Sequence, residues 1–259
     1  MATFGLDGAL VTKFLSNLDV ANVRQDQFTD FFILPQLDAI YTHCGEKLKQ
    51  AVATKLKNGV YGPKPPIEME VPKSLRVSAK TASIIGPNYF RPGSILYPED
   101  RIVYHFIAQE AESVAEAAMD REKVFSHRPS SPPGSGFIPA STQWNALKTA
   151  FENEVKSGKY TVALKCDVAQ FFFSINQHEL LNQLEHQGLQ SEMVKFVEKF
   201  LASLTMDRSS RGILQGLYAS DLLGNEYLTG IDEFISDINI PHFRYVDDIY
   251  IYYLRPAMN

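Results

Sequence analysis

The sequence contains no long hydrophobic run and only two cysteines among its 259 residues. No stretch of about 18 apolar residues occurs, so no membrane-spanning helix is predicted. The first residues have neither a basic start nor an apolar core, and therefore do not resemble a secretory signal peptide. Cys44 and Cys166 are far apart and suit neither a disulfide framework nor a zinc site. We therefore expect a cytoplasmic protein that makes no membrane contact.

Positive charge is also scarce, because 25 Lys and Arg residues stand against 30 Asp and Glu residues, giving a net charge of −5. This balance argues weakly against indiscriminate binding of nucleic acid. One segment differs: residues 47–80 contain eight basic residues against only Glu68 and Glu70. Such segments are usually solvated faces, and next to a nucleotide-binding site this one would be a surface that contacts phosphates.

Apolar residues recur at spacings of three and four along residues 6–57, which predicts helices there. Further helices are expected later in the chain, over residues 99–120, 141–157, 177–187, 190–204 and 217–236. Pro-rich and Gly-rich loops interrupt the pattern at 62–66 and at 128–136, and the second is the best candidate boundary. Residues 67–97 suggest extended or irregular structure. Helices, a strand, more helices and a final hairpin make the pattern of an α+β protein.

Two adjacent carboxylates, Asp247 and Asp248, lie within an apolar and aromatic run that reads Arg-Tyr-Val-Asp-Asp-Ile-Tyr-Ile from Arg244. The flanking residues favour strands, so both carboxylates are expected at a tight turn between two short strands. Adjacent negative charges repel, and burying them is costly unless a cation neutralises them. The turn is thus a candidate site for divalent metal, although an Asp-Asp pair alone is far more often a solvated hairpin tip.

Three other segments contain residues that could complete such a site. Residues 160–166 predict a buried strand that ends at Asp167. An acidic residue at the carboxyl end of a buried strand often belongs to a functional site. A single Asp there more commonly caps the next helix. The cluster Phe171-Phe172-Phe173 follows, and two of its three rings are expected in the core. Glycines on both sides of Gln215 form either a backbone that can approach a ligand closely or a simple entry into a helix. The backbone conformation of Arg91 is restricted by the adjacent Pro92.

In their order along the chain, these four segments resemble the fingers and palm of a reverse transcriptase, and the resemblance extends from about residue 75 to the C-terminus. Residues 245–248 resemble the Tyr-x-Asp-Asp hairpin of that family, and Asp167 with Phe172 resembles its first catalytic strand. Residues 212–216 resemble its Gly-x-Pro-Gln-Gly loop, with Leu214 in place of the proline, and the segment from Arg91 resembles its bacterial fingers segment. Each motif is modest alone, whereas four in this order are highly specific.

The resemblance implies an α+β fold with the fingers and palm of a right-hand polymerase, the palm being an RRM-like sheet with helices. Residues 1–66 would form an N-terminal helical extension, 67–158 the fingers, and 159–259 the palm with the catalytic strand and the Asp-Asp hairpin. Because the sequence ends soon after Asp248, the thumb is expected to be absent.

The resemblance also implies a metal site. Asp167, Asp247 and Asp248 would be the catalytic residues and would hold two Mg²⁺ ions, with Mn²⁺ as an alternative. Carboxylates are suitable ligands for these ions, and Mg²⁺ uses substrate phosphates for its remaining positions.

Four further residues would bind the nucleotide. Arg91 would hold the triphosphate and Lys80 would assist it, because a guanidinium suits phosphate oxygens. Phe172 would stack on the sugar and exclude a 2′-hydroxyl, and Gln215 would line the nucleotide and template side. The expected partners are dNTPs, an RNA template and a DNA or protein primer, and an oligomer remains open.

The activity implied is that of an RNA-directed DNA polymerase, a metal-binding and RNA-binding nucleotidyltransferase. Its pattern is closest to the bacterial reverse transcriptases of abortive infection and anti-phage defence. Thr149 stands where retron enzymes commonly carry a His, and Leu214 departs from the group II intron enzymes, but both types remain alternatives. Further alternatives are a template-independent or catalytically weak DNA polymerase, an inert scaffold that binds nucleic acid, and an RNA-dependent RNA polymerase, against which Phe172 argues.

Overall fold

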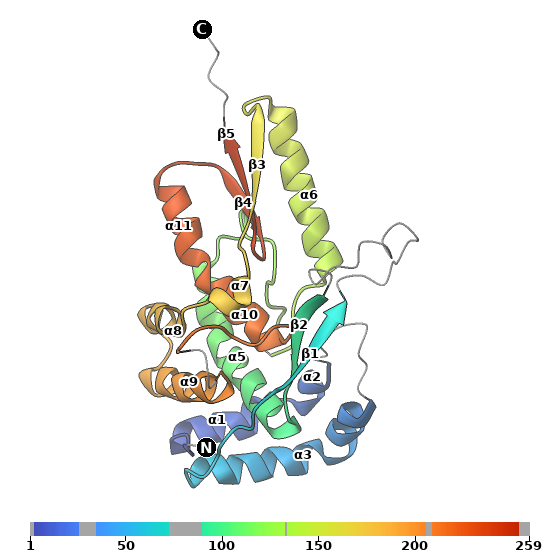
Figure 1. The fold of residues 1–259 in the computed structure, drawn as a ribbon, viewed down its shortest axis with the longest axis vertical. Helices are drawn as coiled ribbons and strands as arrows, with labels where there is room; N and C mark the ends of the chain where they lie inside the picture. Colours follow the sequence, from blue (N-terminus) through green and yellow to red (C-terminus); the bar gives the residue numbers. More distant parts are fainter. Residues whose placement is uncertain (1–2, 26–34, 73–89, 133, 206–208, 254–259) are drawn as a thin grey trace.

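The computed structural model describes residues 3–25, 35–72, 90–132, 134–205 and 209–253 (Figure 1). Lys80 lies outside the described residues, as do Lys73 and Arg76 of the basic segment. The same holds for Phe28, Phe31 and Phe32, which belong to the apolar pattern of residues 6–57.

Among its described residues, the N-terminal part of the chain forms three helices: α1 (Gly8–Asn17), α2 (Val20–Gln25) and α3 (Pro35–Lys57). Helix α1 begins after Asp7, whose carboxylate accepts a hydrogen bond of 2.7 Å from the backbone N–H of Leu10 and so caps the helix. Phe14 of α1 packs edge-to-face on Phe106, with 5.2 Å between ring centroids. Phe106 belongs to the long helix α5 (Pro98–Ala118), which α2 and α3 also contact. The helices predicted over 6–57 are confirmed within the described residues.

Helix α5 is central to the hydrophobic core. Helix α5 packs against α10 (Tyr218–Tyr227). Helices α8 (Gln177–His186) and α9 (Ser191–Leu204) pack against each other beside this pair (Figure 1). Tyr104 of α5 shows the packing, because its ring contacts Phe200 of α9 and its hydroxyl lies 2.9 Å from that of Ser220 on α10.

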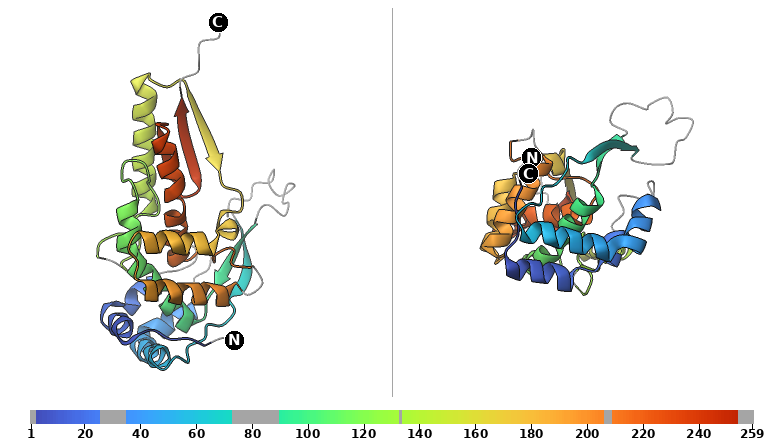
Figure 2. Two further views of the ribbon diagram at one scale, coloured as in Figure 1. Left: turned by 90° about the vertical axis from the view of Figure 1, so that its left-hand side faces the viewer. Right: turned by 90° about the horizontal axis from the view of Figure 1, so that it is seen from below.

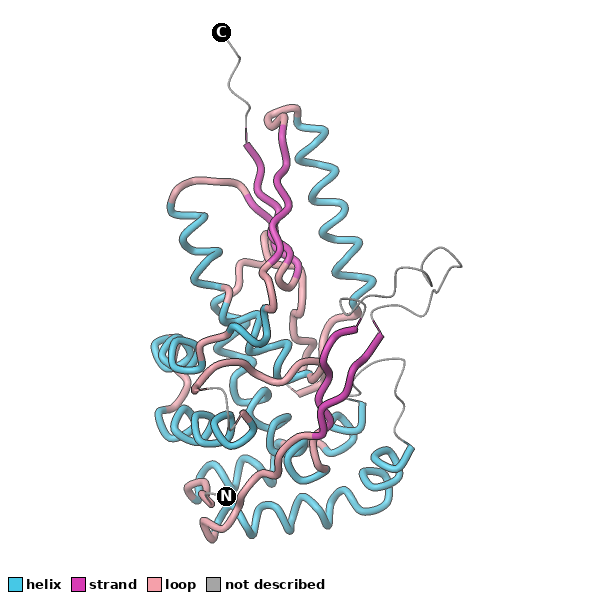
Figure 3. The backbone as a smooth tube through the Cα atoms, viewed as in Figure 1, coloured by secondary structure: helices cyan, strands magenta, loops and turns pink. Residues whose placement is uncertain are grey.

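The strands form two separate antiparallel sheets (Figure 3). Strands β1 (Ile67–Pro72) and β2 (Phe90–Ile95) pair with each other, while β3 (Val162–Asp167), β5 (Asp248–Tyr253) and β4 (His242–Tyr245) form a sheet in that order. Helix α6 (Ala140–Ser157) runs beside the three-stranded sheet (Figures 1 and 2), with the Phe151 ring against Tyr250 and Tyr252. Gly158 ends α6 with φ +68°, a left-handed conformation that glycine adopts without strain. The α+β architecture is confirmed.

Two local predictions are wrong. The strand expected to be buried, 160–166, is an edge strand of its sheet and is mostly exposed; Leu164 keeps 49% of its surface accessible. The single helix expected over 217–236 is two helices, α10 and α11 (Thr229–Asp237). They separate where the Glu226 carbonyl accepts hydrogen bonds from the hydroxyl of Thr229 and the side-chain amide of Gln183, which replace a continuing helical bond.

Within the part of the chain that the structure describes, no helix is both long and apolar enough to cross a bilayer. Cys44 and Cys166 are both free, as expected from their separation.

Candidate active site

The Asp pair lies at the tip of the β4–β5 hairpin. Two residues, Val246 and Asp247, form the turn, and Asp248 is already the first residue of β5, paired with Tyr245. The prediction of a tight turn between two strands is thus confirmed, except that Asp248 belongs to a strand. Val246 has φ +56°, a left-handed value that is rare for a β-branched residue.

Asp167 meets this hairpin tip across the sheet. It is the last residue of β3 and stands directly opposite Asp248 in the β3–β5 register. Residues directly opposite each other in an antiparallel pair lie on the same face, with Cβ atoms about 4.5–5.5 Å apart. The structure therefore brings Asp167, at one end of the sheet, to the adjacent Asp247 and Asp248, which follow it by about 80 residues in the sequence. Asp167 is exposed, and Asp247 and Asp248 are half-buried.

The electrostatics of this end are dominated by negative charge. Burial raises the pKa of Asp247 above its ordinary value, and the neighbouring negative charges of Asp167 and Asp248 raise it further. The one described cation at these carboxylates is Lys165, whose Nζ lies 2.8 Å from Oδ2 of Asp248. The hydrogen bond to Asp248 raises the pKa of Lys165, so this ammonium stays charged.

The carboxylates suit a divalent cation, but they do not form a ready-made cage. Among the described residues, no group of three acidic, histidine or cysteine side chains is placed to hold one ion. Mg²⁺ commonly takes one or two carboxylates and completes its shell with water and substrate phosphates. Asp167 and Asp248 stand opposite each other, and burial and the charges of both neighbours disfavour a negative charge on Asp247. A divalent cation would relieve this repulsion, so the three carboxylates fit an ion that binds together with a phosphate-bearing substrate. Their role as metal ligands stays a prediction.

The structure brings Phe172 and the Gln215 loop together beside the end of β3. Phe172 belongs to the short helix α7 (Phe171–Ser174), and its carbonyl accepts a 2.8 Å hydrogen bond from the N–H of Ile213. The N–H of Gly212 donates to the carbonyl of Ile175 at 2.8 Å. Gly212 has φ +80°, and a Cβ there would lie 3.3–3.4 Å from backbone atoms of the α7 segment. Glycine thus lets the loop carrying Gln215 lie directly against the residues that follow Asp167.

The ring of Phe172 is largely buried. It is 8% exposed and contacts Phe171, with 5.0 Å between centroids. Both rings lie against Gly224 of α10, where an added Cβ would come within 3.0–3.1 Å of them. Phe171 and Phe172 are therefore the two core rings expected from the cluster, while Phe173 is half-buried. A role of Phe172 in recognising the sugar stays a prediction.

Of the residues predicted to bind phosphate, Lys80 lies outside the described residues, and Arg91 is placed by its backbone alone, so their role stays a prediction. Arg91 lies on β2, opposite Val71, in the two-stranded sheet below and to the right of the Asp hairpin in Figure 1. The basic segment is partly neutralised, because Lys49 is buried against the Leu18 carbonyl and Glu46, and Lys55 pairs with Glu99 at 2.7 Å.

A buried polar cluster behind the hairpin was not predicted. Arg244 on β4 is completely buried and binds Asp232 of α11 and Asn225 of α10. His242 lies on the same face, with Nε2 3.4 Å from Oδ1 of Asp232. Burial alone would raise the pKa of Asp232, but the nearby His242 and the hydrogen-bonded guanidinium of Arg244 hold it below its ordinary value. Alternation along β4 gave no signal for this cluster, because its apolar residues are Phe243 and Tyr245 whereas the buried ones are His242 and Arg244.

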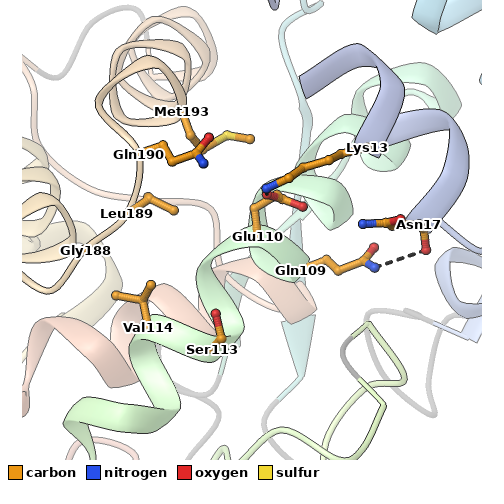
Figure 4. A pocket seen from close by; sticks show the side chains of 10 residues that line it. All are labelled: Lys13, Asn17, Gln109, Glu110, Ser113, Val114, Gly188, Leu189, Gln190 and Met193. Carbon is orange, nitrogen blue, oxygen red and sulfur yellow. Dashed lines mark hydrogen bonds and ion pairs between the residues drawn. The ribbon is translucent and has the colours of Figure 1, made fainter. Parts of the chain in front are cut away.

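A separate cavity of about 320 Å³ lies in the helical part (Figure 4). Its rim includes the ion pair between Lys13 of α1 and Glu110 of α5, at 3.1 Å, and the α8–α9 connection at Gly188. None of the residues lining it belongs to β3, β4 or β5, so it is separate from the carboxylate cluster.

Comparison with known proteins gives one family. The family model described as reverse transcriptase (RNA-dependent DNA polymerase) matches residues 80–257, which includes all seven predicted site residues. No curated protein matches the chain.

Several solved structures resemble the chain weakly, and two of them illustrate the likeness. They are described as "Partial Cas6-RT-Cas1--Cas2 complex" and "Cas6-RT-Cas1--Cas2 complex", and each is 12% identical with a TM-score of 0.44. The matches cover 95% of this chain but only 37% and 23% of the two others, so the chain spans well under half the length of either. At this level the likeness supports no functional conclusion.

Proposed function

Since the chain belongs to the reverse transcriptase family, we propose that it is an RNA-directed DNA polymerase that adds dNTPs to a 3′-hydroxyl. The observation that carries the proposal is the meeting of Asp167 with the Asp247–Asp248 hairpin at one end of a sheet. In this reaction the 3′-oxygen loses its proton and bonds to the α-phosphorus, while the bond to the β-phosphate oxygen breaks and pyrophosphate leaves.

In this proposal the three carboxylates bind two divalent ions, with Mg²⁺ as the expected metal. Two such ions would stabilise the attacking oxygen and the leaving pyrophosphate. Asp167 and Asp248 approach the substrate from adjacent strands, and Asp247 does so from the turn. Phe172, held beside Asp167 by the Gly212 loop, would contact the sugar, Gln215 the nucleotide and template side, and Arg91 and Lys80 the triphosphate.

The proposed setting is bacterial anti-phage defence, in the cytoplasm, with an RNA template and a DNA or protein primer. It is supported by the sequence pattern around Thr149 and Leu214, which departs from the retron and group II intron types. Leu214 is 3% exposed, so burial anchors the loop where those relatives have proline.

The first prediction tests the chemistry. Asp247→Asn should lower dNTP incorporation in the presence of Mg²⁺ by at least about 10³-fold, because it removes a charge that the two-metal arrangement requires. Incorporation of labelled dNTP on primed RNA measures this. Asp237→Asn is the matched control, since Asp237 is an exposed carboxylate at the end of α11 and should leave the rate unchanged. Wild-type incorporation that survives Asp247→Asn would refute the proposed mechanism.

One observation favours a second function, that of a nucleic-acid-binding scaffold without catalysis. Asp248 is engaged by Lys165, and the three carboxylates do not form a preassembled metal cage among the described residues. RNA binding by the wild-type chain, with no incorporation on any primer or template, would select this alternative.

A further inference from the structure

The strained turn at the hairpin tip is tied to one buried side chain. Nη1 of Arg244 donates to the carbonyl of Val246, the residue immediately before Asp247, at 3.1 Å. Val246 holds φ +56°, a conformation that a β-branched residue keeps only when its surroundings fix it. The side chain of Arg244 is therefore placed to hold the backbone from which Asp247 projects.

Arg244 is itself firmly held. Its Nε lies 3.0 and 2.8 Å from the two carboxylate oxygens of Asp232, and its Nη2 lies 2.6 Å from one of them. Nη2 also donates to the backbone carbonyl of Asn225 at 3.2 Å, and Nη1 bonds the Asn225 side chain. With 0% exposure, the guanidinium has no competing water, which strengthens these charge-assisted bonds.

The backbone of Arg244 is fixed as well. Its N–H donates to the carbonyl of Lys123 at 2.8 Å, and its carbonyl accepts from the N–H of Phe125 at 3.0 Å. One residue thus joins the turn to the 120–125 segment, to α10 and to α11. Because α10 directly follows the loop containing Gln215, this network connects the two parts of the candidate active site.

We propose that Arg244 is a positioning residue: it sets the orientation of the turn bearing Asp247 relative to Asp167 and to the helix behind the Gln215 loop. The inference rests on the proposed function, because the position of this turn affects a reaction only if Asp247 contacts the reacting groups. A displacement of about 1 Å at such a group can lower a rate by about 100-fold.

Two variants test this proposal. Arg244→Lys keeps a positive charge for Asp232 but lacks the fork that reaches Val246 and Asn225 simultaneously. The double variant Arg244→Met with Asp232→Leu removes both charges and so leaves no unpaired buried charge. If the double variant does not fold, Arg244→Lys decides the result.

Arg128→Lys is the matched control. Arg128 is also buried, binds both carboxylate oxygens of Glu116, and donates to the carbonyl of Val124 at 3.0 Å. It has the same chemistry but no bond to the turn.

The first readout is amide hydrogen exchange, which does not depend on activity. Both Arg244 variants should exchange about tenfold faster over residues 245–249, with exchange in α9 unchanged, and Arg128→Lys should not affect the turn. The second readout is steady-state incorporation: kcat should fall about 10- to 100-fold, with KM for dNTP within about twofold, because Arg244 lies behind the site.

Unchanged exchange at the turn would overturn the inference, as would equally faster exchange in α9, or a wild-type kcat in an Arg244 variant with a loosened turn. A wild-type protein that incorporates no dNTP would instead refute the proposed function, and the exchange data would still decide whether Arg244 positions the turn.

Discussion

Among single residues, Lys165 has the most direct effect on the candidate metal ligands. It lies two residues before Asp167 on β3 and therefore on the same face of the strand, and its ammonium pairs with Asp248. Its side chain is 55% exposed, so solvent screens the pair and limits its strength. A cation entering the site would compete with this ammonium for Asp248.

We therefore predict that Lys165→Met tightens binding of Mn²⁺ alone by up to about fivefold, because exposed ion pairs are worth about 0.2–1 kcal/mol. Electron paramagnetic resonance titration of Mn²⁺ measures the affinity. Lys148→Met removes another largely exposed lysine, on α6, and should change nothing. Weaker Mn²⁺ binding in Lys165→Met would mean that the lysine holds Asp248 in its binding position, contrary to the prediction.

Among the elements, the contact between α7 and α10 sets the position of Phe172. Gly224 is the point of closest approach, because its missing side chain leaves room for the rings of Phe171 and Phe172. Any larger residue must displace the rings or separate the helices, since packed interiors have little free volume.

Gly224→Ala should lower the free energy of unfolding by about 1–3 kcal/mol, although alanine favours helices more than glycine does. Gly230→Ala is the matched control: Gly230 lies in α11 with nothing within 4 Å of an added Cβ, and alanine there should stabilise by up to about 1 kcal/mol. Urea unfolding measures both. Stabilisation by both substitutions would show that the α7–α10 contact is looser than described.

The elements also show what the sequence could reveal. The periodic helices α5 and α6, and the stop at Gly158, were predicted because local spacing and capping determine them. The break between α10 and α11 was missed because it depends on Gln183, a residue more than 40 positions away. β3 was predicted to be buried because its apolar run does not reveal that it is an edge strand.

The candidate site was predictable to a similar extent. Asp167, Asp247 and Asp248 were recognised from their flanking motifs, and the structure brings them together. Lys165 and Arg244 stood within the same motifs, but only the fold shows that Lys165 pairs with Asp248 and that the Arg244 side chain bonds the turn. Arg91 was grouped with these residues by family resemblance; its backbone lies on β2 of the two-stranded sheet, and its role stays a prediction.

At the scale of the whole molecule, two buried carboxyl groups, Glu226 and Glu112, contribute a pH-dependent part of the stability. Burial raises the pKa of Glu226, on α10, from 4.5 to about 7, more than the interactions with Gln187 and Arg244 lower it. Burial likewise raises that of Glu112 to about 7, although the backbone N–H of Gly134 bonds its carboxylate. Between these pKa values each of the two carboxyl groups keeps its proton in the folded chain but loses it in the unfolded chain, so their contribution to stability falls as pH rises from about 4.5 to about 7.

Glu226→Gln should remove its share of this dependence. The free energy of unfolding of the wild type, minus that of the variant, should fall by up to about 3 kcal/mol as pH rises from 4.5 to 7. Above that range the difference should stay level. Denaturant unfolding at several pH values measures it, and Glu152→Gln, at an exposed carboxylate, should give a flat difference. A difference that rises with pH would contradict the assignment of a raised pKa.

The proposed function requires that β3 and the β4–β5 hairpin, which are far apart in the sequence, form a single catalytic site. This claim is tested most directly by the rate of Mg²⁺-dependent dNTP incorporation in wild type, Asp167→Asn, Asp247→Asn and the double variant. Residues that act as one unit are strongly non-additive, so each single substitution should lower the rate by at least about 10³-fold and the double variant should lose little more. A wild-type rate in either single variant, or independent losses that multiply in the double variant, would contradict the claim.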